Sequence, residues 1–268
     1  MLRPSFRSWA FRACYYAVSV FFVLTAAALL AIPSRRPVTA WIRLYARVMV
    51  QAMRRVGGID ARTHGALPEG PVILAAKHQS WGDGFVTYAA VPDLAFVCGA
   101  HLTRIPLAGG ILRGLGAIVV RQCGGADARG SLTAGLAEAK RANRSVLIYP
   151  EGHLAPVGTK HRYRKGVWHL YAEMGVPVVP VATDLGLRWP QARVRLTPGP
   201  ASVRFLPAIP PGLGKDAFMA RLEDAVETEC LAMLDAQRAA GTLPEGWRMP
   251  ADRRAPAPRI GQAAGAPT

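Results

Sequence analysis

A run of twenty residues without a charged side chain dominates the N-terminal part of this sequence. It covers residues 13–32 and reads ACYYAVSVFFVLTAAALLAI. As an α-helix, such a run would be about 30 Å long, which matches the hydrocarbon core of a bilayer. The run therefore predicts a helix placed in a membrane.

Basic residues surround this apolar run. The 268-residue chain has 33 Lys and Arg against 17 Asp and Glu, a formal net charge of +16. More than half of this excess lies before Asp60, where the sequence has nine arginines, no lysine and no acidic residue. The position of the charge favours an anionic membrane surface as its partner. Nucleic acid is disfavoured, because no known binding motif and no interleaving of aromatic and basic residues is present.

Three interpretations of the run remain. A signal peptide would be cleaved after the small residues 26–28, but signal-peptide apolar regions are only about 7–15 residues long. A buried core helix fits poorly with basic residues on both flanks. A membrane helix is the third, either as a single transmembrane span or as half of a hairpin.

A second segment favours the hairpin. Residues 41–56 predict an amphipathic helix with arginines largely off its apolar face, as in a helix that lies in a membrane interface. The face consists of Trp41, Leu44, Tyr45, Val48 and Ala52. We therefore expect a helical hairpin that dips into one leaflet from the cytoplasmic side, where every arginine reaches the headgroups.

From Gly65 onward, short apolar runs alternate with helix-like stretches. The predicted strands are 72–76, 94–98, 117–121, 146–149, 178–182, 193–196 and 202–206, and the predicted helices are 126–142, 166–174 and 216–239. This pattern is typical of an α/β fold with a mostly parallel sheet covered by helices. We expect membrane-associated helices in residues 1–60, an α/β domain in 61–249 and a disordered tail, rich in Pro, Ala and Gly, in 250–268.

The segment KHQSWGD, residues 77–83, directly follows the first of these strands. Ligands collect at the carboxyl ends of strands in open α/β sheets, so a site is expected here. His78 and Asp83 can meet if the histidine lies in a loop and the aspartate in the next turn, which would leave one ring nitrogen free as a general base. By itself the spacing fits a hydrogen-bonded loop histidine equally well. Ser80 lacks the Gly-x-Ser-x-Gly pattern of a nucleophile and is interpreted as a turn residue.

Three more segments accompany predicted strands. GAIVVR ends in Arg121, whose guanidinium would suit a phosphate, although a surface arginine is the commoner case. YPEG brings Glu151 and Gly152 to a strand exit, where a helix-capping glutamate is the alternative. VPVVPVA is most simply a core strand. A basic run follows YPEG and contains Lys160, His161, Arg162, Arg164 and Lys165.

In this order and at this spacing, KHQSWGD, GAIVVR, YPEG and VPVVPVA resemble the four signature blocks of the glycerolipid acyltransferases. The resemblance covers roughly residues 71–187, and four ordered blocks are far more specific than one. It implies a membrane-associated α/β enzyme with an N-terminal helical membrane motif. Such an enzyme transfers an acyl group from acyl-CoA or acyl carrier protein to the hydroxyl of a lysophospholipid, typically 1-acyl-glycerol-3-phosphate, and forms phosphatidic acid.

The resemblance also implies roles for individual residues. His78 falls on the catalytic base and Asp83 on its partner. Arg121 falls on a phosphate-contacting arginine, and Glu151 and Gly152 fall on the acceptor-binding block. A thioester donor has a good leaving group, so no metal and no cofactor other than the acyl donor is expected.

Two positions depart from the family pattern. Lys77 stands where Asn or Ser usually precedes the histidine, and His153-Leu154 replaces the usual Thr-Arg after the glycine. The missing arginine is expected to contact the acceptor phosphate. Either a cation in residues 162–165 replaces it, or the acceptor has another headgroup, as in a lyso-ornithine lipid. The residues assigned to substrate binding are Arg121, Glu151, Gly152, Lys160, Arg162 and Arg164.

Two further functions stay open at this point. A metal-dependent hydrolase would use Asp83 with His78, His101, His153 and His161, but no HExxH motif or close ligand pair supports it. A catalytically inactive member that only binds lipid is compatible with the altered third block. An acyl-transfer assay separates that member from an enzyme.

Overall fold

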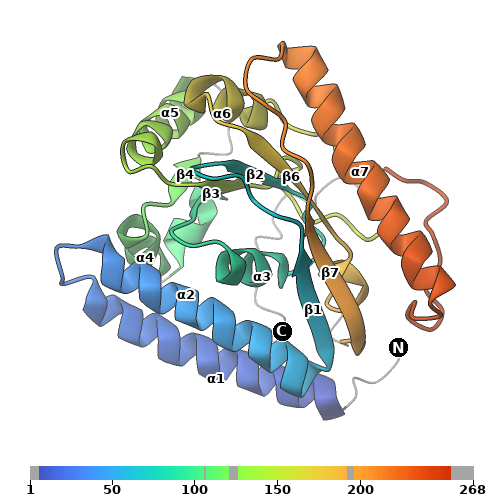
Figure 1. The fold of residues 1–268 in the computed structure, drawn as a ribbon. Helices are drawn as coiled ribbons and strands as arrows, with labels where there is room; N and C mark the ends of the chain where they lie inside the picture. The colour runs from blue at the N-terminus through green and yellow to red at the C-terminus, as the bar shows by residue number, and fades with distance from the viewer. Residues whose placement is uncertain (1–5, 106, 121–125, 192–195, 255–268) are drawn as a thin grey trace.

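The computed structural model describes residues 6–105, 107–120, 126–191 and 196–254. These residues form a seven-stranded sheet in the order β1-β7-β6-β2-β5-β3-β4 (Figure 1). The strands are β1 (Ile59–His64), β2 (Ile73–Ala76), β3 (Ala95–Gly99), β4 (Ile118–Val120), β5 (Val146–Ile148), β6 (Val178–Thr183) and β7 (Gly199–Phe205). Neighbouring strands are parallel except β6 and β7, which are antiparallel. The prediction of a mostly parallel sheet is confirmed.

Helices cover both faces of the sheet (Figure 1). They are α1 (Phe6–Leu29), α2 (Arg35–Ala52), α3 (Asp83–Ala90), α4 (Ala108–Gly114), α5 (Ala126–Arg141), α6 (Gly166–Met174) and α7 (Lys215–Ala239). One core packs Ile73 and Val178 against α5, α6 and α7, and the other packs Leu74 and Val179 against α1, α2 and α3. Successive residues of β2 and β6 thus enter opposite cores, which explains why these strands are apolar at nearly every position.

The helices α1 and α2 form a hairpin that is packed onto the α/β domain. Phe11 of α1 is fully buried, and its ring meets the ring of Trp189 edge-on at 5.0 Å between centroids. The hydroxyl of Ser8 accepts a hydrogen bond of 3.1 Å from the backbone N–H of Leu196. The predicted hairpin is therefore present, and it shares the core of the domain.

The second hairpin helix differs from its prediction. α2 begins at Arg35 and ends at Ala52, where a π-helical turn, Met53–Gly57, takes over. Within the predicted apolar face, Leu44 is 44% exposed and Ala52 is buried, while Met49, which lies outside that face, is completely buried. The reason is that α2 lies between α1 and α3 and buries side chains on two sides (Figure 1).

Strand β1 has no counterpart in the sequence analysis. Its residues, IDARTH, alternate poorly between apolar and polar side chains. It lies at the edge of the sheet and pairs with β7 alone. Polar residues are tolerated at such an edge, so the strand has no run of apolar residues by which it could be predicted.

The outer side of α1 exposes large apolar side chains. Trp9, Val20, Phe21 and Leu24 are each more than half exposed. At about 100° per residue they fall within roughly one third of the helix circumference. Within the described residues, α1 is the one helix long and apolar enough to cross a membrane, judged by length and composition. A continuous exposed apolar strip of this kind marks an interaction surface.

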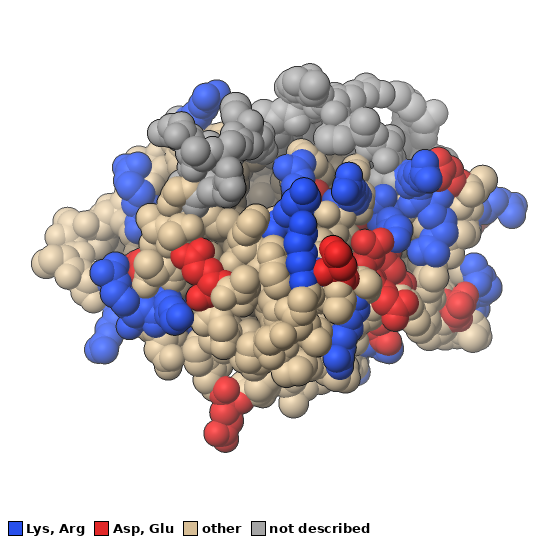
Figure 2. Space-filling view, turned by 90° about the horizontal axis from the view of Figure 1, so that it is seen from above, with Lys and Arg blue, Asp and Glu red and all other residues tan. Residues whose placement is uncertain are grey.

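Charged side chains are mixed on the face shown in Figure 2. Lysines and arginines lie there in separate groups, with aspartates and glutamates between them. Among the described residues visible there, the basic side chains form no continuous stripe of the kind that follows a nucleic-acid backbone.

Three predicted segments lie partly outside the described residues, the strand 117–121 at its last residue and two others more extensively. Residues 255–268 of the predicted tail and residues 192–195, which include most of the predicted strand 193–196, are not described. Residues 250–254 are described, and the carbonyl of Arg253 accepts a 2.8 Å hydrogen bond from the N–H of Lys160. The division at residue 60 falls within β1, so the boundary between hairpin and domain has no break in the secondary structure.

Candidate active site

His78 lies in the loop between β2 and α3, at the carboxyl end of the central strand. β2 is hydrogen-bonded to β5 on one side and to β6 on the other, so segments that follow these three parallel strands share one edge of the sheet. The chain turns at residues 80–82, and α3 begins at Asp83 itself. Nδ1 of His78 then lies 3.1 Å from Oδ2 of Asp83. The structure brings the two predicted catalytic residues together.

Asp83 is buried and held by several donors. Its Oδ2 accepts hydrogen bonds from the backbone N–H groups of Gln79 at 2.7 Å and Ser80 at 2.8 Å. Its Oδ1 lies 3.4 Å from the hydroxyl of Thr183, which belongs to β6. These bonds fix the carboxylate beside His78. The hydroxyl of Ser80 accepts from the N–H of Gly82 at 3.0 Å, consistent with a turn residue.

The other side of the imidazole is covered by Tyr149, a residue to which sequence reasoning gave no role. Its ring stacks on that of His78, with 3.9 Å between centroids and 16° between planes. Burial raises the pKa of Tyr149 well above its ordinary value, and the charge of Asp83 raises it further. The imidazole is therefore held on two sides, with Nδ1 towards Asp83. The signal available in the sequence was the position of Tyr149 at the end of β5, next to β2.

Lys77 points away from His78 into a buried ionic cluster. Its ammonium donates to Oε1 of Glu151 at 2.5 Å, to Oε1 of Glu227 at 2.7 Å and to the carbonyl of Thr159 at 3.0 Å. Glu227 also accepts from the hydroxyl of Tyr163 at 3.1 Å. The Lys77 side chain is completely unexposed. The departure of this chain from Asn or Ser thus places a cation between two carboxylates.

The pKa values of this cluster are shifted in ways that follow from burial. Burial raises the pKa of Glu151 to about 7, although the charge of Lys77 opposes the shift. For Lys77, burial acts to lower the pKa, but the two carboxylates outweigh it and the pKa is raised. Glu151, predicted to bind substrate, is 1% exposed and contacts Lys77, so its side chain supports the site from beneath.

Arg164 approaches the position where the family arginine is missing. Gly152 has φ of +72°, and a Cβ there would lie 2.8 Å from Nε of Arg164. Nη2 of Arg164 donates to Nε2 of His153 at 2.7 Å. Burial lowers the pKa of His153, and the charge of Arg164 lowers it further. A neutral His153 can accept this bond and hold the guanidinium over Gly152.

A cavity of about 470 Å³ opens beside these residues. It is lined by Glu151, His153, His161, Arg162, Tyr163, Arg164 and Lys165. Nε2 of His161 lies 3.3 Å from the carbonyl of Leu154, while burial lowers the His161 pKa. The charge of His78 acts on His153 of this lining, and the N–H of Ala155 donates a 2.8 Å hydrogen bond to the carbonyl of His78, so this basic cavity lies near the His78–Asp83 pair.

The remaining predicted binding residues are Lys160, Arg162 and Arg121. The ammonium of Lys160 forms an ion pair with Glu223 of α7, so it is engaged away from the cavity. Arg162 is exposed and lines the cavity. Arg121 lies outside the described residues, and its assignment to phosphate binding stays a prediction. In the part of the chain that the structure describes, no group of three or more His, Cys, Asp or Glu side chains is arranged to hold a metal ion.

Residues 54–184 match the family model described as Acyltransferase, and this segment contains β2, His78, Asp83, Glu151 and β6. The matched segment is 131 of the 268 residues, and over this segment the chain resembles the family.

Curated relatives are consistent with this. The chain is 29% identical over 170 residues to the 1-acyl-sn-glycerol-3-phosphate acyltransferase of Pseudomonas aeruginosa. This alignment covers 63% of this chain and 66% of that protein. It is 32% identical over 123 residues to the lyso-ornithine lipid O-acyltransferase of the same organism, 46% of each chain. The alignments thus span between about half and two thirds of these relatives.

A solved structure shares the fold. The 1-acyl-sn-glycerophosphate acyltransferase PlsC from Thermotoga maritima superposes with a TM-score of 0.65 over 85% of this chain and 95% of that one. The two sequences are 19% identical over this region, so the likeness concerns the fold.

Proposed function

We propose that the protein is an O-acyltransferase that transfers an acyl group from acyl-CoA or acyl carrier protein to the hydroxyl of a lysophospholipid. The observation that carries the proposal is the His78–Asp83 contact of 3.1 Å at the carboxyl end of β2, beside a basic cavity. The match to the family model and the names of the two relatives from Pseudomonas aeruginosa support it.

The chemistry follows from the geometry of His78. Since Nδ1 faces Asp83, Nε2 is the nitrogen that accepts the proton of the acceptor hydroxyl, a general-base contribution of about 10²–10⁴ in rate. The hydroxyl oxygen attacks the thioester carbonyl, and the C–S bond breaks as the C–O bond is completed. The imidazolium returns its proton to the thiolate leaving group. The nucleophile belongs to the substrate, so no acyl-enzyme, metal or further cofactor takes part.

Two groups of the protein stabilise charge during the reaction. Asp83 orients the imidazole and stabilises the imidazolium, as the carboxylate of a serine-hydrolase triad does. Backbone N–H groups in the first turn of α3 meet the oxyanion that develops on the carbonyl oxygen.

The basic cavity accounts for the acceptor headgroup. We assign Arg164, held by His153 over Gly152, to the role of the absent family arginine, with Arg162 beside it at the mouth. A phosphate there makes the acceptor 1-acyl-glycerol-3-phosphate and the product phosphatidic acid. A lyso-ornithine lipid is the second candidate, because one relative bears that name and because His153-Leu154 replaces Thr-Arg.

The exposed strip of α1 and the arginines of the hairpin support a location at the cytoplasmic face of the cell membrane. The packing of Phe11 and Ser8 against the α/β domain favours a hairpin lying in one leaflet over a helix that spans the bilayer. Membrane lipid is then a partner, and nucleic acid is not.

Initial rates with purified protein test this function. Wild type, His78→Ala and Arg164→Gln are assayed with lysophosphatidic acid and with lyso-ornithine lipid at saturating donor. His78→Ala should be inactive with either acceptor. Arg164→Gln should raise the KM for lysophosphatidic acid by about 10–150-fold, the value of a charged hydrogen bond. The exposed Arg221 of α7, changed to Gln, is the matched control.

Each part of the proposal can fail separately. Full activity of His78→Ala would refute the mechanism. An unchanged KM of Arg164→Gln in an otherwise active enzyme would refute the phosphate assignment only. Faster turnover of lyso-ornithine lipid by wild type would identify that lipid as the acceptor.

A further inference from the structure

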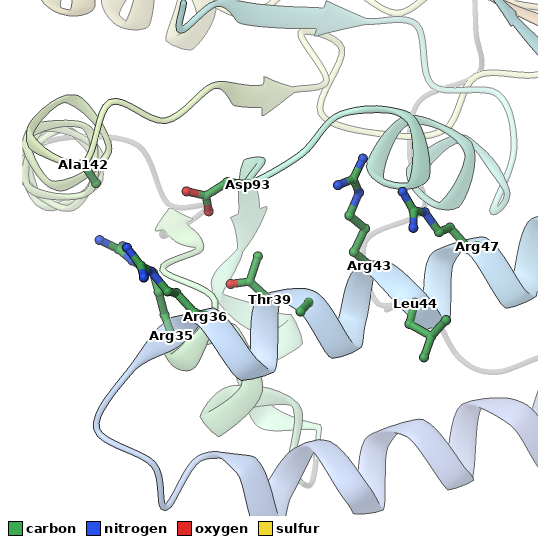
Figure 3. Close-up of a pocket in the computed structure, with 9 residues that line it drawn as sticks. Arg35, Arg36, Thr39, Arg43, Leu44, Arg47, Asp93 and Ala142 are labelled. Atoms are coloured by element: carbon green, nitrogen blue, oxygen red, sulfur yellow. The ribbon is translucent and has the colours of Figure 1, made fainter.

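A second basic cavity lies at the amino ends of the strands, whereas His78 lies at their carboxyl ends. It has a volume of about 570 Å³ and is lined by Arg35, Arg36, Thr39, Ala40, Arg43, Leu44, Arg47, Asp93 and Ala142 (Figure 3). Asp93 precedes β3 and Ala142 precedes β5, so the cavity lies at the amino ends of these strands. Tyr149, at the carboxyl end of β5, belongs to the candidate active site. At about 3.3 Å per residue, β5 separates the two sites by roughly 10 Å or more.

The cavity is strongly cationic. Figure 3 shows Arg35, Arg36, Arg43 and Arg47 leaving α2 on the side that faces the α/β domain, whereas Leu44 leaves on the other side. Arg35 forms an ion pair with Glu138 at 3.2 Å. For Arg36, Arg43 and Arg47, the described residues provide no carboxylate within ion-pair distance. Like charges gathered on one wall repel one another and favour an anion between them.

The one carboxylate among the lining residues is already engaged. Oδ1 of Asp93 accepts a hydrogen bond of 2.8 Å from Nε of Arg144, whose side chain is completely unexposed. Asp93 therefore serves as the counterion of a buried arginine, and the arginines of α2 remain available to a ligand.

Two buried polar atoms of the cavity have no hydrogen-bond partner among the described residues. They are Oγ1 of Thr39 and Nε of Arg43. Thr39 is 9% exposed and lies one turn into α2, close to the positive end of the helix dipole. Buried donors are nearly always satisfied, so unsatisfied ones that line a cavity indicate a ligand that accepts hydrogen bonds. Guanidinium groups with a hydroxyl beside them suit the oxygens of a phosphate.

We propose that this cavity binds the phosphate of an anionic lipid headgroup, as a site distinct from the one that holds the acceptor. The lipid source follows from the hairpin. α1 lies outermost and exposes Phe21 and Leu24, and α2 lies on its inner side (Figure 1). An interfacial helix buries its apolar face about 5–10 Å deep, and packed helices are about 8–10 Å apart. The arginines of α2 then stand at the level of the phosphates.

Binding to vesicles tests the proposal. Full-length protein is mixed with vesicles of phosphatidylcholine alone or with added phosphatidylglycerol, and the ratio of the two dissociation constants is measured. Thr39→Val removes the unpartnered hydroxyl without changing the net charge. It should reduce the preference for phosphatidylglycerol about tenfold or more, whereas Thr39→Ser, which keeps the hydroxyl, should retain it.

Two double variants with the same change in charge distinguish a specific phosphate site from general electrostatic attraction to an anionic membrane. Arg43→Gln with Arg47→Gln removes two charges in the cavity, and Arg54→Gln with Arg55→Gln removes two from the following turn. The preference for phosphatidylglycerol vesicles should fall at least tenfold more in the Arg43→Gln, Arg47→Gln protein than in the Arg54→Gln, Arg55→Gln control. Equal losses, or a Thr39→Val protein that binds like wild type, would overturn the site.

A soluble phosphate distinguishes the source. Glycerol 3-phosphate added in excess should leave vesicle binding of the wild type almost unchanged if the cavity takes a headgroup fixed in the membrane. Tight binding of glycerol 3-phosphate that Thr39→Val abolishes would assign the cavity to a soluble phosphate and overturn the lipid assignment. None of these measurements requires acyl transfer, so they stand apart from the proposed reaction.

Discussion

Replacing Lys77 with methionine should remove the cation of a buried cluster and keep most of its volume. Its ammonium contacts Glu151 at 2.5 Å and Glu227 at 2.7 Å, and the exposed fractions of the three side chains are 0%, 1% and 11%. Removing one partner from such a buried group typically costs about 3–5 kcal/mol, because the remaining charges are left unpaired. For a chain of this size, that loss lowers the melting temperature by about 6–20 °C.

The effect should depend on pH in a defined direction. In the wild type, burial raises the Glu151 pKa from 4.5 to about 7, so the folded state holds this proton more tightly than the unfolded state. Its contribution to stability is therefore present below 4.5 and is lost as the pH rises through 7. Without Lys77 the pKa rises further, and the loss of stability should be larger at about pH 8 than at about pH 5.

The assay is thermal unfolding of detergent-solubilised protein at both pH values. Lys140→Met, which removes an exposed lysine of α5, is the control and should melt with the wild type. Combining Lys77→Met with Glu151→Gln and Glu227→Gln should recover part of the loss, because no unpaired charge remains. A Lys77→Met protein that melts within about 1 °C of wild type at about pH 8 would refute the reasoning.

Three further predictions concern the site and the hairpin. Asp83→Asn should lower kcat by about 10²–10⁴-fold with a nearly unchanged acceptor KM, because the imidazole stays but its tautomer is no longer fixed. Steady-state rates measure this effect, and a normal kcat would contradict the role of Asp83. Gly152→Ala should raise the acceptor KM, because the new Cβ would lie 2.8 Å from Arg164, and an unchanged KM would separate Arg164 from the acceptor. Phe21→Gln with Leu24→Gln should weaken vesicle binding without lowering the melting temperature, since both side chains are exposed, and full retention on vesicles would exclude this strip as the membrane contact.

The central sheet could be predicted from the sequence because its strands are buried on both faces. β2, β5 and β6 are apolar at nearly every position, and the turn from β2 to α3 carries His78 and Asp83 within six residues. A contact that local depends on one turn of chain, so its geometry follows from the segment itself.

Other features depend on distant parts of the chain. Glu227 lies 150 residues from Lys77 in sequence, and only the docking of α7 brings them together. Met49 lies outside the predicted apolar face of α2, and only the packing of α2 against α1 and α3 explains why it is buried. The role of Arg164 rests on the left-handed turn at Gly152, which no residue spacing reveals.

The closing contacts of the hairpin set an order of events during synthesis. Ser8 and Phe11 are made before their partners Leu196 and Trp189, which follow about 180 residues later. At about 5–20 residues per second, the hairpin waits roughly 9–40 s for these partners. During that interval α1 can pack on α2, which is made directly after it, while its outer apolar strip stays exposed and available to a membrane. The α/β domain is then completed on a hairpin that has already formed.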